Sequence, residues 1–176
     1  MSKLPAPVAD AAEHVASDSW VTPRWLAELV GPFDLDPATN SRSHIVASKT
    51  YQLERGEDGL TSPWTGSVWC NGPYSQPLPW CRRLAGHSGP WCALWKLDTT
   101  TEWFATMVDA GASWAPFRDR LRFERPDKAP LTANFASVLV WRDWTVPVAL
   151  RPYLWLRGEA ARINPHQPDL FASVTP

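Results

Sequence analysis

Residues 67–75 read Ser-Val-Trp-Cys-Asn-Gly-Pro-Tyr-Ser, an apolar run followed at once by a turn sequence. The apolar run predicts a buried strand, because a strand that is covered on both faces needs no polar side. Asn, Gly and Pro favour a sharp turn at its end. This stretch therefore predicts a buried strand that carries the Asn71 side chain to the edge of a sheet.

Strand-like and helix-like patterns alternate on both sides of this stretch. Thr22 is expected to be the N-cap of a first helix with Pro23 at its first position, and Thr99 with Glu102 reads as the capping box of a later one. The expected helices are residues 22–31, 77–84 and 99–111, and the expected strands are 33–36, 67–70, 91–97, 113–117, 121–123, 136–141 and 148–156. This order predicts an α/β sheet with right-handed crossovers.

Polar side chains lie where three of the expected strands end. Asp36 precedes Pro37 at the end of the first strand, Asn71 follows the second, and Asp98 follows the third. Ligands of such sheets bind beyond the carboxyl ends of the strands. We therefore expect these polar groups to lie along one edge, where a ligand would bind.

The length of 176 residues fits one domain with a well-filled core. Residues 1–18 are rich in Ala, Pro and Asp and predict a flexible N-terminal arm. Residues 158–176 are polar and contain Pro, which predicts a disordered C-terminal tail. The domain would span residues 19–157.

Composition narrows the class of protein. A net charge of −1 does not indicate a protein that binds nucleic acid over its whole surface, so any basic surface has to be local. The three cysteines, Cys70, Cys81 and Cys92, predict reduced thiols in a cytoplasmic protein. Neither they nor the four histidines have the spacing of metal ligands, so no metal site is expected. No apolar run reaches about 18 residues, which predicts a protein that does not span a membrane.

The turn at residues 71–74 has the groups needed to hold an amino group of a planar base. The Asn71 side chain and the Gly72 backbone each offer a carbonyl oxygen as acceptor, Pro73 fixes the backbone, and Tyr74 offers a ring face. Two acceptors aimed at one amine would turn its lone pair toward an electrophile. This suits methyl transfer to an amino nitrogen, catalysed mainly by positioning. The alternative is an ordinary turn that closes a strand.

Several motifs occur in a characteristic order between residues 19 and 143. They are Trp20-Val21-Thr22-Pro23, Phe33-Asp34-Leu35-Asp36-Pro37-Ala38, Asp58-Gly59-Leu60 with Trp64, Asn71-Gly72-Pro73-Tyr74-Ser75, Leu97-Asp98-Thr99 with Trp103-Phe104, and Arg120-Leu121-Arg122-Phe123. In this order they resemble the phage-type DNA N6-adenine methyltransferases, the small Dam-like enzymes of bacteriophages and prophages. The resemblance implies a single-domain Rossmann-like methyltransferase sheet with flanking helices and a small target-recognition domain or no separate one.

The resemblance also implies a cofactor and roles for residues. S-adenosylmethionine would be the methyl donor, and the tetrapeptide Asn71, Gly72, Pro73 and Tyr74 would be catalytic. The implied cofactor-binding residues are Thr22 and Pro23 beside its methionine end, Asp34, Asp36 and Pro37 on the first strand and turn of its pocket, and Asp58 facing its adenine amine. Two departures stand out: Gly72 replaces the usual Pro, and no Gly-x-Gly follows Pro37. Gly is less rigid than Pro, so retained chemistry with a loss in rate is expected.

The implied substrate is double-stranded DNA, from which the target adenine would be rotated out of the stack. Candidate DNA contacts are Ser75, Arg118, Arg120, Arg122 and Arg125, although such a run also suits a solvated edge strand and loop. Methylation of cytosine N4 or of a protein glutamine amide stays open, because each presents an amine that the same turn can hold. A catalytically silent DNA-binding or clamp-binding protein with this fold also remains open.

A second motif lies in the tail. Residues 167–171 read Gln-Pro-Asp-Leu-Phe, which resembles the short peptide by which bacterial replication and repair proteins bind the sliding clamp. An extended peptide would place Leu170 and Phe171 in an apolar pocket and Gln167 in a polar one. The alternative is a chance apolar pair. Together with the resemblance, this predicts a phage- or prophage-encoded protein in the bacterial cytoplasm.

Overall fold

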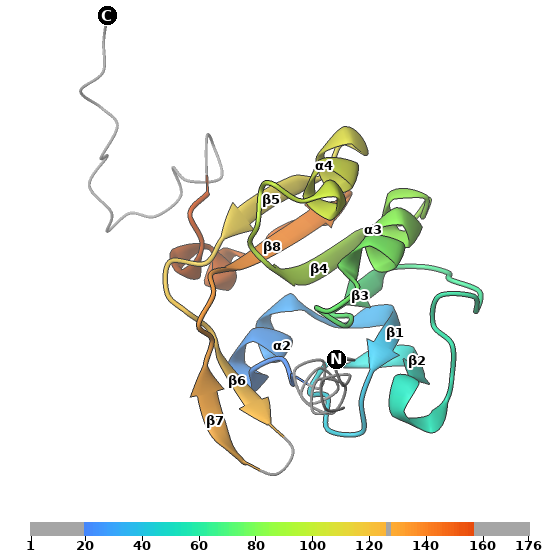
Figure 1. Cartoon of the computed structure of the whole chain (residues 1–176), viewed down its shortest axis with the longest axis horizontal. Coiled ribbons are helices and arrows are strands. Elements are labelled where there is room, and N and C mark those ends of the chain that lie inside the picture. The colour runs from blue at the N-terminus through green and yellow to red at the C-terminus, as the bar shows by residue number, and fades with distance from the viewer. Residues whose placement is uncertain (1–19, 126–127, 157–176) are drawn as a thin grey trace, which may run out of the picture.

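Six strands form one sheet in the order β2-β1-β3-β4-β8-β5 in the computed structural model, which describes residues 20–125 and 128–156 (Figure 1). The strands are β1 (Phe33–Thr39), β2 (Ala47–Gln52), β3 (Val68–Cys70), β4 (Trp91–Lys96), β5 (Ser113–Pro116) and β8 (Ser137–Arg142). The first four are mutually parallel, and β8 runs antiparallel between β4 and β5. The predicted α/β class is therefore confirmed as a mixed, mostly parallel sheet, whereas the predicted arm and tail lie outside the described residues.

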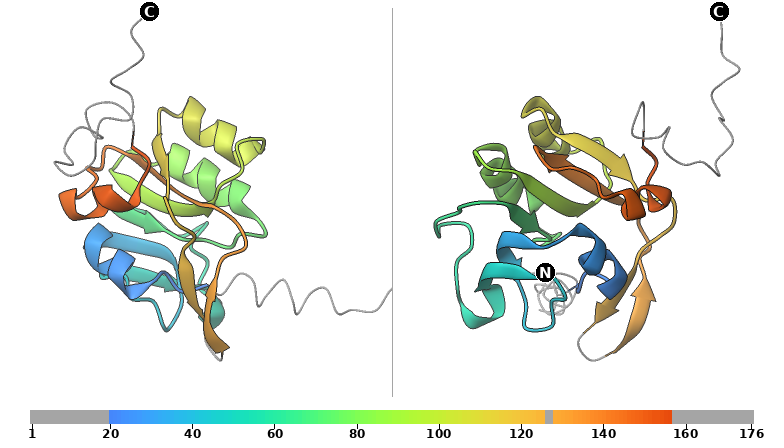
Figure 2. Two further views of the ribbon diagram at one scale, coloured as in Figure 1. Left: turned by 90° about the vertical axis from the view of Figure 1, so that its left-hand side faces the viewer. Right: turned by 180° about the vertical axis from the view of Figure 1, so that it is seen from behind.

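Helices cover both faces of the sheet. The helices α3 (Pro77–Ala85) and α4 (Glu102–Asp109) pack together on one face, and α2 (Arg24–Val30) and the 3-10 helix η2 (Val148–Tyr153) lie on the other (Figure 2). Side chains along β4 alternate accordingly. Trp91, Ala93 and Trp95 belong to the core under α3 and α4, and Cys92 and Leu94 belong to the core under α2. This strand is apolar throughout because both of its faces are buried.

The parallel strands end along one edge of the sheet, as the sequence predicts. The chain leaves β1 for β2 on one side and leaves β3 for β4 on the other, so the strand order reverses between β1 and β3. Such a reversal opens a crevice beyond the carboxyl ends of the two strands. Asn71 follows β3 directly, and Asp98 lies two residues beyond the end of β4.

A hairpin extends beyond this same edge. It consists of β6 (Arg122–Arg125) and β7 (Lys128–Thr132), which are inserted between β5 and β8 and run past α2 (Figures 1 and 2). Glu124 of β6 forms a backbone bridge with Val21, and its carboxylate lies 2.9 Å from His44 Nε2. The hydrogen bond from His44 lowers the pKa of the Glu124 carboxyl. These contacts hold the base of the hairpin against the segment that precedes α2.

Several local expectations are wrong at the ends of elements. Thr22 is not the N-cap of α2: Pro23 occupies that position, and no side chain caps the helix. Thr99 and Glu102 form no capping box, since Thr101 is the N-cap of α4 and its hydroxyl donates to the Asp98 carbonyl. Side chains near both helix starts thus bond to groups outside the first turn.

Two expected strands also differ. β1 does not end at Pro37 but continues to Thr39, with a register shift between Asp36 and Thr39 that accommodates the proline. Residues 148–153 form the helix η2 rather than a strand, because Pro147 and Pro152 have no N–H to donate to a ladder.

Three further observations concern the class of protein. Over the ranges 20–125 and 128–156, no helix is long and apolar enough to cross a membrane. The same residues contain no cluster of His, Cys, Asp and Glu that would hold a metal ion. The cysteines are unpaired and buried, and burial raises the pKa of the Cys70, Cys81 and Cys92 thiols. They therefore stay protonated and unreactive at neutral pH.

Candidate active site

The Asn71 side chain is held by the segment that precedes α2. Its Nδ2 donates to Thr22 Oγ1 at 3.1 Å and makes a longer contact of 3.5 Å with the Trp20 carbonyl oxygen. Thr22 and Trp20 precede Asn71 by 49 and 51 residues in the sequence, yet they contact its side chain at the end of β3. The amide of Asn71 is therefore fixed in one orientation, with its nitrogen turned toward Thr22.

The side-chain oxygen of Asn71 has no hydrogen-bond partner among the described residues. Oδ1 is buried and accepts no hydrogen bond within the part of the chain that the structure describes. Leaving such an acceptor unsatisfied costs about 1–3 kcal/mol, so it calls for an explanation. A bound group with an N–H or O–H donor would satisfy it, which is what the sequence predicts for this oxygen.

Gly72 lies between two tryptophans. A Cβ built on it would come within 3.1 Å of the Trp80 indole and 3.2 Å of Trp95 Cη2. Both contacts are tighter than a side-chain carbon normally makes. The glycine at this position is therefore explained by the indole rings that cover it.

Tyr74 belongs to an aromatic wall next to Asn71. Its ring centroid lies 5.7 Å from Phe135, 5.9 Å from Trp95 and 6.4 Å from Phe123. Trp20 continues the wall, 5.1 Å from Phe123. Burial raises the pKa of the Tyr74 hydroxyl, which has no hydrogen-bond partner among the described residues. The sequence predicted Tyr74 for the site. Phe123 of the hairpin appears in the sequence only as part of a motif, and no local signal identifies Phe135 in the loop after the hairpin.

A cavity of about 160 Å³ opens beside this wall. It is lined by Tyr74, Pro77, Trp95, Lys96, Asp98, Thr101 and Trp103. Asn71 and Gly72 do not line it, and Asn71 Oδ1 is covered. The cavity therefore does not extend to the Asn71 oxygen.

The end of β1 carries a buried carboxylate. Asp36 Oδ1 accepts from the Ala38 N–H at 3.2 Å, and desolvation raises the pKa of Asp36 to about 7. Gly59 packs on this end of the strand, since a Cβ built on it would lie 1.8 Å from the Pro37 carbonyl oxygen. Gln52, the last residue of β2, has a buried Oε1 without a partner among the described residues. Unsatisfied or desolvated acceptors thus stand at the ends of β1, β2 and β3.

Two predicted cofactor residues bond within the protein instead. Asp34 lies at the opposite edge, where its Oδ2 accepts from the backbone N–H and the hydroxyl of Ser67 at 2.7 and 2.8 Å. These hydrogen bonds lower the pKa of Asp34. Asp58 is exposed and accepts from Leu60 and Thr61 of its own turn, which lowers the pKa of Asp58. The structure brings Thr22, Pro23, Asp36 and Pro37 toward the carboxyl edge, but not Asp34.

Comparison with known proteins identifies a family and a relative. The model of the family described as DNA N-6-adenine-methyltransferase (Dam) matches residues 10–154. The chain belongs to the Dam family. A DNA N-6-adenine-methyltransferase of Haemophilus phage HP1 (strain HP1c1) is 32% identical over 101 residues. These cover 52% of this chain and 57% of the phage protein, so the match spans little more than half of the relative's length. No solved structure matches the chain.

The predicted DNA contacts of this Dam family member fall into two groups. Arg118 donates through Nε to the Leu154 carbonyl and lies over the Trp155 ring at 4.2 Å, and Arg120 donates to the Ala133 carbonyl at 3.3 Å. Ser75 and Arg122 are exposed, Ser75 in the turn after Tyr74 and Arg122 on β6. Arg125 ends β6, but its side chain is outside the described part. Arg118 and Arg120 therefore also brace the loops beyond β5.

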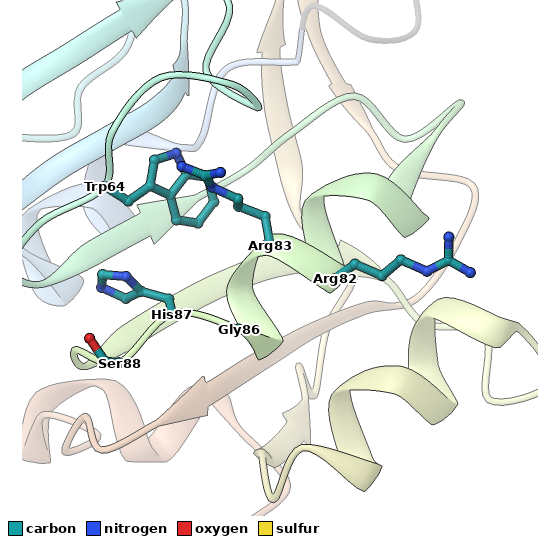
Figure 3. A pocket seen from close by; sticks show the side chains of 6 residues that line it. All are labelled: Trp64, Arg82, Arg83, Gly86, His87 and Ser88. Carbon is teal, nitrogen blue, oxygen red and sulfur yellow. The ribbon is translucent and has the colours of Figure 1, made fainter.

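A larger cavity lies away from the Dam tetrapeptide. It measures about 390 Å³ and is lined by Trp64, Arg82, Arg83, Gly86, His87 and Ser88, where α3 ends (Figure 3). Arg83 lies over the Trp64 ring at 5.2 Å and donates to the Ser62 carbonyl, while Arg82 points away and pairs with Glu102. Both arginines thus have partners within the protein, and no residue predicted for the site lines this cavity.

Proposed function

We propose that this protein is an S-adenosylmethionine-dependent methyltransferase that transfers a methyl group to the N6 amine of adenine in DNA. Membership of the Dam family supports the reaction class, and the name of the phage HP1 relative supports the substrate. The observation that carries the proposal is the buried, unsatisfied Oδ1 of Asn71 beyond the end of β3. An exocyclic amine brings the N–H donors that this oxygen lacks.

The strand order supports a Rossmann-like methyltransferase sheet. The reversal between β1 and β3 is the place where such sheets bind nucleotide-like cofactors. Asn71 stands at the end of β3 and Asp36 near the end of β1, so both flank this crevice. A cofactor bound there would have its reactive end within reach of the tetrapeptide.

The groups at this edge fit S-adenosylmethionine. Its ribose hydroxyls, adenine amine and ammonium group are all donors, and its sulfonium is a cation. Two buried acceptors stand near this edge: Gln52 Oε1 at the end of β2, which has no partner among the described residues, and the Asp36 carboxyl near the end of β1, which accepts from the Ala38 N–H and is desolvated. When bound, the cofactor supplies an electrophilic methyl group. Asp36 and Gln52 are the residues that we assign to hold it.

In the proposed reaction the protein mainly positions the amine. The target base leaves the duplex, because its amine is unreachable inside the stack. The base enters from the cavity beside Tyr74, displaces part of the aromatic wall and stacks on the Tyr74 ring, a contact worth about 1–3 kcal/mol. Asn71 Oδ1 and the Gly72 carbonyl accept the two amine hydrogens. Held in this way, the nitrogen would keep its lone pair free to attack the methyl group that the cofactor would supply, and no strong base is needed for the approach. The N–CH3 bond would form as the S–CH3 bond breaks, the bond pair would return to sulfur as a neutral thioether, and one N6 proton would leave to water.

Purified protein incubated with labelled S-adenosylmethionine and unmethylated DNA tests the proposal. The wild type should transfer label to DNA, and Asn71→Ala should lose nearly all transfer while it still binds the cofactor in calorimetry. A control variant, Ser88→Ala at the distant cavity, should behave as the wild type. A wild type that binds no cofactor, or binds it without transfer, would instead support a silent DNA-binding or clamp-binding protein.

Cytosine N4 is the closest alternative target, since its amine suits the same pair of acceptors. Digestion of the labelled DNA to nucleosides and mass analysis separates the two reactions. We expect N6-methyl-2′-deoxyadenosine alone. Label found only in N4-methyl-2′-deoxycytidine would mean that the same turn holds the cytosine amine and that cytosine is the substrate.

We further propose that the protein is phage- or prophage-encoded, acts in the bacterial cytoplasm and binds the sliding clamp through Gln167, Leu170 and Phe171. These tail residues lie outside the described part, so the support is the sequence alone. Clamp binding would concentrate the enzyme on newly replicated DNA without new contacts at the active site. A bacterial clamp should retain the wild type and lose a variant with Leu170→Ala and Phe171→Ala; equal retention contradicts this proposal.

A further inference from the structure

We propose that Thr22 is a positioning residue, which together with the Trp20 carbonyl sets the Asn71 amide so that its oxygen faces the target amine. This inference rests on the proposed function. It gives Thr22 a role in the methyl-transfer step that differs from the contact with the cofactor expected from sequence.

The contact between Thr22 and Asn71 has the length of a normal hydrogen bond and is buried. Nδ2 of Asn71 lies 3.1 Å from Thr22 Oγ1, and Thr22 is 3% exposed. The Thr22 hydroxyl does not cap α2, although it stands directly before the N-cap Pro23. The hydroxyl is therefore available to the Asn71 amide rather than to the helix that follows it.

A hydroxyl alone does not decide which way an amide points. It can accept from the Asn71 nitrogen or donate to the Asn71 oxygen, and both arrangements satisfy it. The Trp20 carbonyl makes the choice, because it can only accept, and it lies 3.5 Å from Nδ2. With the amide turned over, two oxygens would face each other there. The pair of Trp20 and Thr22 thus holds the nitrogen on its side and leaves Oδ1 on the other.

The orientation matters because the two ends of the amide have opposite chemistry. An amine that is to attack through its lone pair must give its hydrogens to acceptors. Oδ1 can accept them, whereas an Asn71 turned over would offer two N–H donors and compete for the lone pair. The buried, unpartnered state of Oδ1 among the described residues shows that no other group competes for it.

The segment that carries Thr22 is itself anchored at several points. Val21 and Glu124 exchange backbone hydrogen bonds of 3.1 and 3.3 Å, and the Trp20 ring packs on Phe123 and Phe135. The position of Thr22 is therefore fixed by the base of the hairpin. An amide held in this way needs no reorganisation when substrate arrives.

Two variants of Thr22 separate positioning from packing. Thr22→Val keeps the shape and removes the acceptor, and Thr22→Ser keeps the hydroxyl. We expect Thr22→Val to lower kcat about tenfold, with KM for DNA and Kd for S-adenosylmethionine within about twofold of the wild type, and Thr22→Ser to restore most of kcat. Thr106→Val, which removes a hydroxyl bonded to the Glu102 carbonyl on α4, is the matched control and should leave kcat unchanged. A Thr22→Val variant that weakens cofactor binding with kcat intact would overturn the inference.

A second readout does not depend on activity. The side-chain amide protons of Asn71, observed by NMR in the wild type and in the Thr22→Ser variant, should exchange slowly with solvent, and Thr22→Val should speed up this exchange without lowering Tm by more than the control does. Unchanged exchange in Thr22→Val contradicts the positioning role. A wild type with protected Asn71 protons that transfers no methyl group would refute the proposed function and leave the Thr22–Asn71 contact established.

Discussion

Gly72 and Trp80 are packed so closely that a single added carbon on Gly72 would lie 3.1 Å from two atoms of the indole. The sequence suggests that Gly in place of the usual Pro loosens the tetrapeptide. The structure gives a reason for the glycine itself: Trp80 and Trp95 occupy the space that a side chain at position 72 would need. The two rings also restrain the turn that Gly alone would leave flexible.

Substitution of Gly72 should therefore destabilise the fold. We expect Gly72→Ala and Gly72→Pro to lower the free energy of unfolding by about 1–3 kcal/mol, the usual cost of overpacking. Urea denaturation measures it, and Gly86→Ala, whose nearest contact would be an ordinary 3.6 Å, is the control. A second change, Trp80→Phe, should recover part of the loss in Gly72→Ala. A Gly72→Pro variant as stable and more active than the wild type would show that the tryptophans do not dictate the glycine.

Asn71→Asp should retain more activity than Asn71→Ala. A carboxylate keeps acceptors for the amine, but it loses the N–H that Thr22 Oγ1 and the Trp20 carbonyl accept. The Thr22 hydroxyl can rotate to donate to the new oxygen, whereas the Trp20 carbonyl cannot. We expect a kcat between those of the wild type and Asn71→Ala, measured by methyl transfer to DNA. Equal loss in both variants would mean that the acceptor alone is not sufficient.

The buried Asp36 should make the protein less stable as pH rises. Its pKa is 3.8 when exposed and about 7 in the fold, so between these values the native state holds a proton that the unfolded state has lost. The stability contributed by this proton is complete below about pH 4 and disappears as pH approaches 7. Between about pH 5 and pH 8 the wild type should therefore lose on the order of a few kcal/mol relative to Asp36→Asn. Parallel pH profiles of the two unfolding free energies would contradict a buried, protonated carboxyl.

Gly59 should be essential for the loop that covers the end of β1. A Cβ at this position would overlap the Pro37 carbonyl, so Gly59→Ala forces the loop away from the strand. We expect weaker cofactor binding in calorimetry together with a lower Tm. Gly86→Ala, at the end of α3, changes the same residue type without a close contact. Normal cofactor affinity in Gly59→Ala would separate this loop from the cofactor pocket.

Arg122 should contribute to DNA affinity through the exposed face of the hairpin. Removal of one phosphate contact lowers the slope of log affinity against log salt by about one. Arg122→Ala should show this change in DNA-binding titrations at several salt concentrations, whereas Arg82→Ala, on the exposed surface of α3, should not. An unchanged slope in Arg122→Ala would exclude it from the DNA contacts.

The turn at residues 71–74 was predictable because its signal is local. Residues 67–75 carry the strand, the turn and the Asn71 amide together, and β3 and α3 lie within a residue or two of the expected positions. The alternation of elements likewise suffices for the α/β class. What the local pattern cannot contain is the partner of each polar group. Thr22 looks like a helix cap until the fold brings Asn71 to it.

The acids illustrate the same limit. Asp34, Asp36 and Asp58 look equivalent as candidate cofactor ligands, but their surroundings differ. Asp34 bonds to Ser67 across the sheet, and Asp58 bonds to its own turn. Of the three, only Asp36 is buried. Burial depends on packing from distant segments, so no spacing rule distinguishes the three. Gln52 was missed because β2 is a polar edge strand without an apolar alternation.

The hairpin of β6 and β7 interrupts a connection that the sheet itself does not need, because β5 and β8 pair directly with each other. Its tip can lengthen, shorten or change its side chains while the edge that carries Asn71 stays the same. The part of the hairpin nearest the sheet is less free to change, because Glu124 there pairs with the Val21 backbone. Two proteins of this design can thus keep the same sheet edge and differ in the hairpin that extends beyond it.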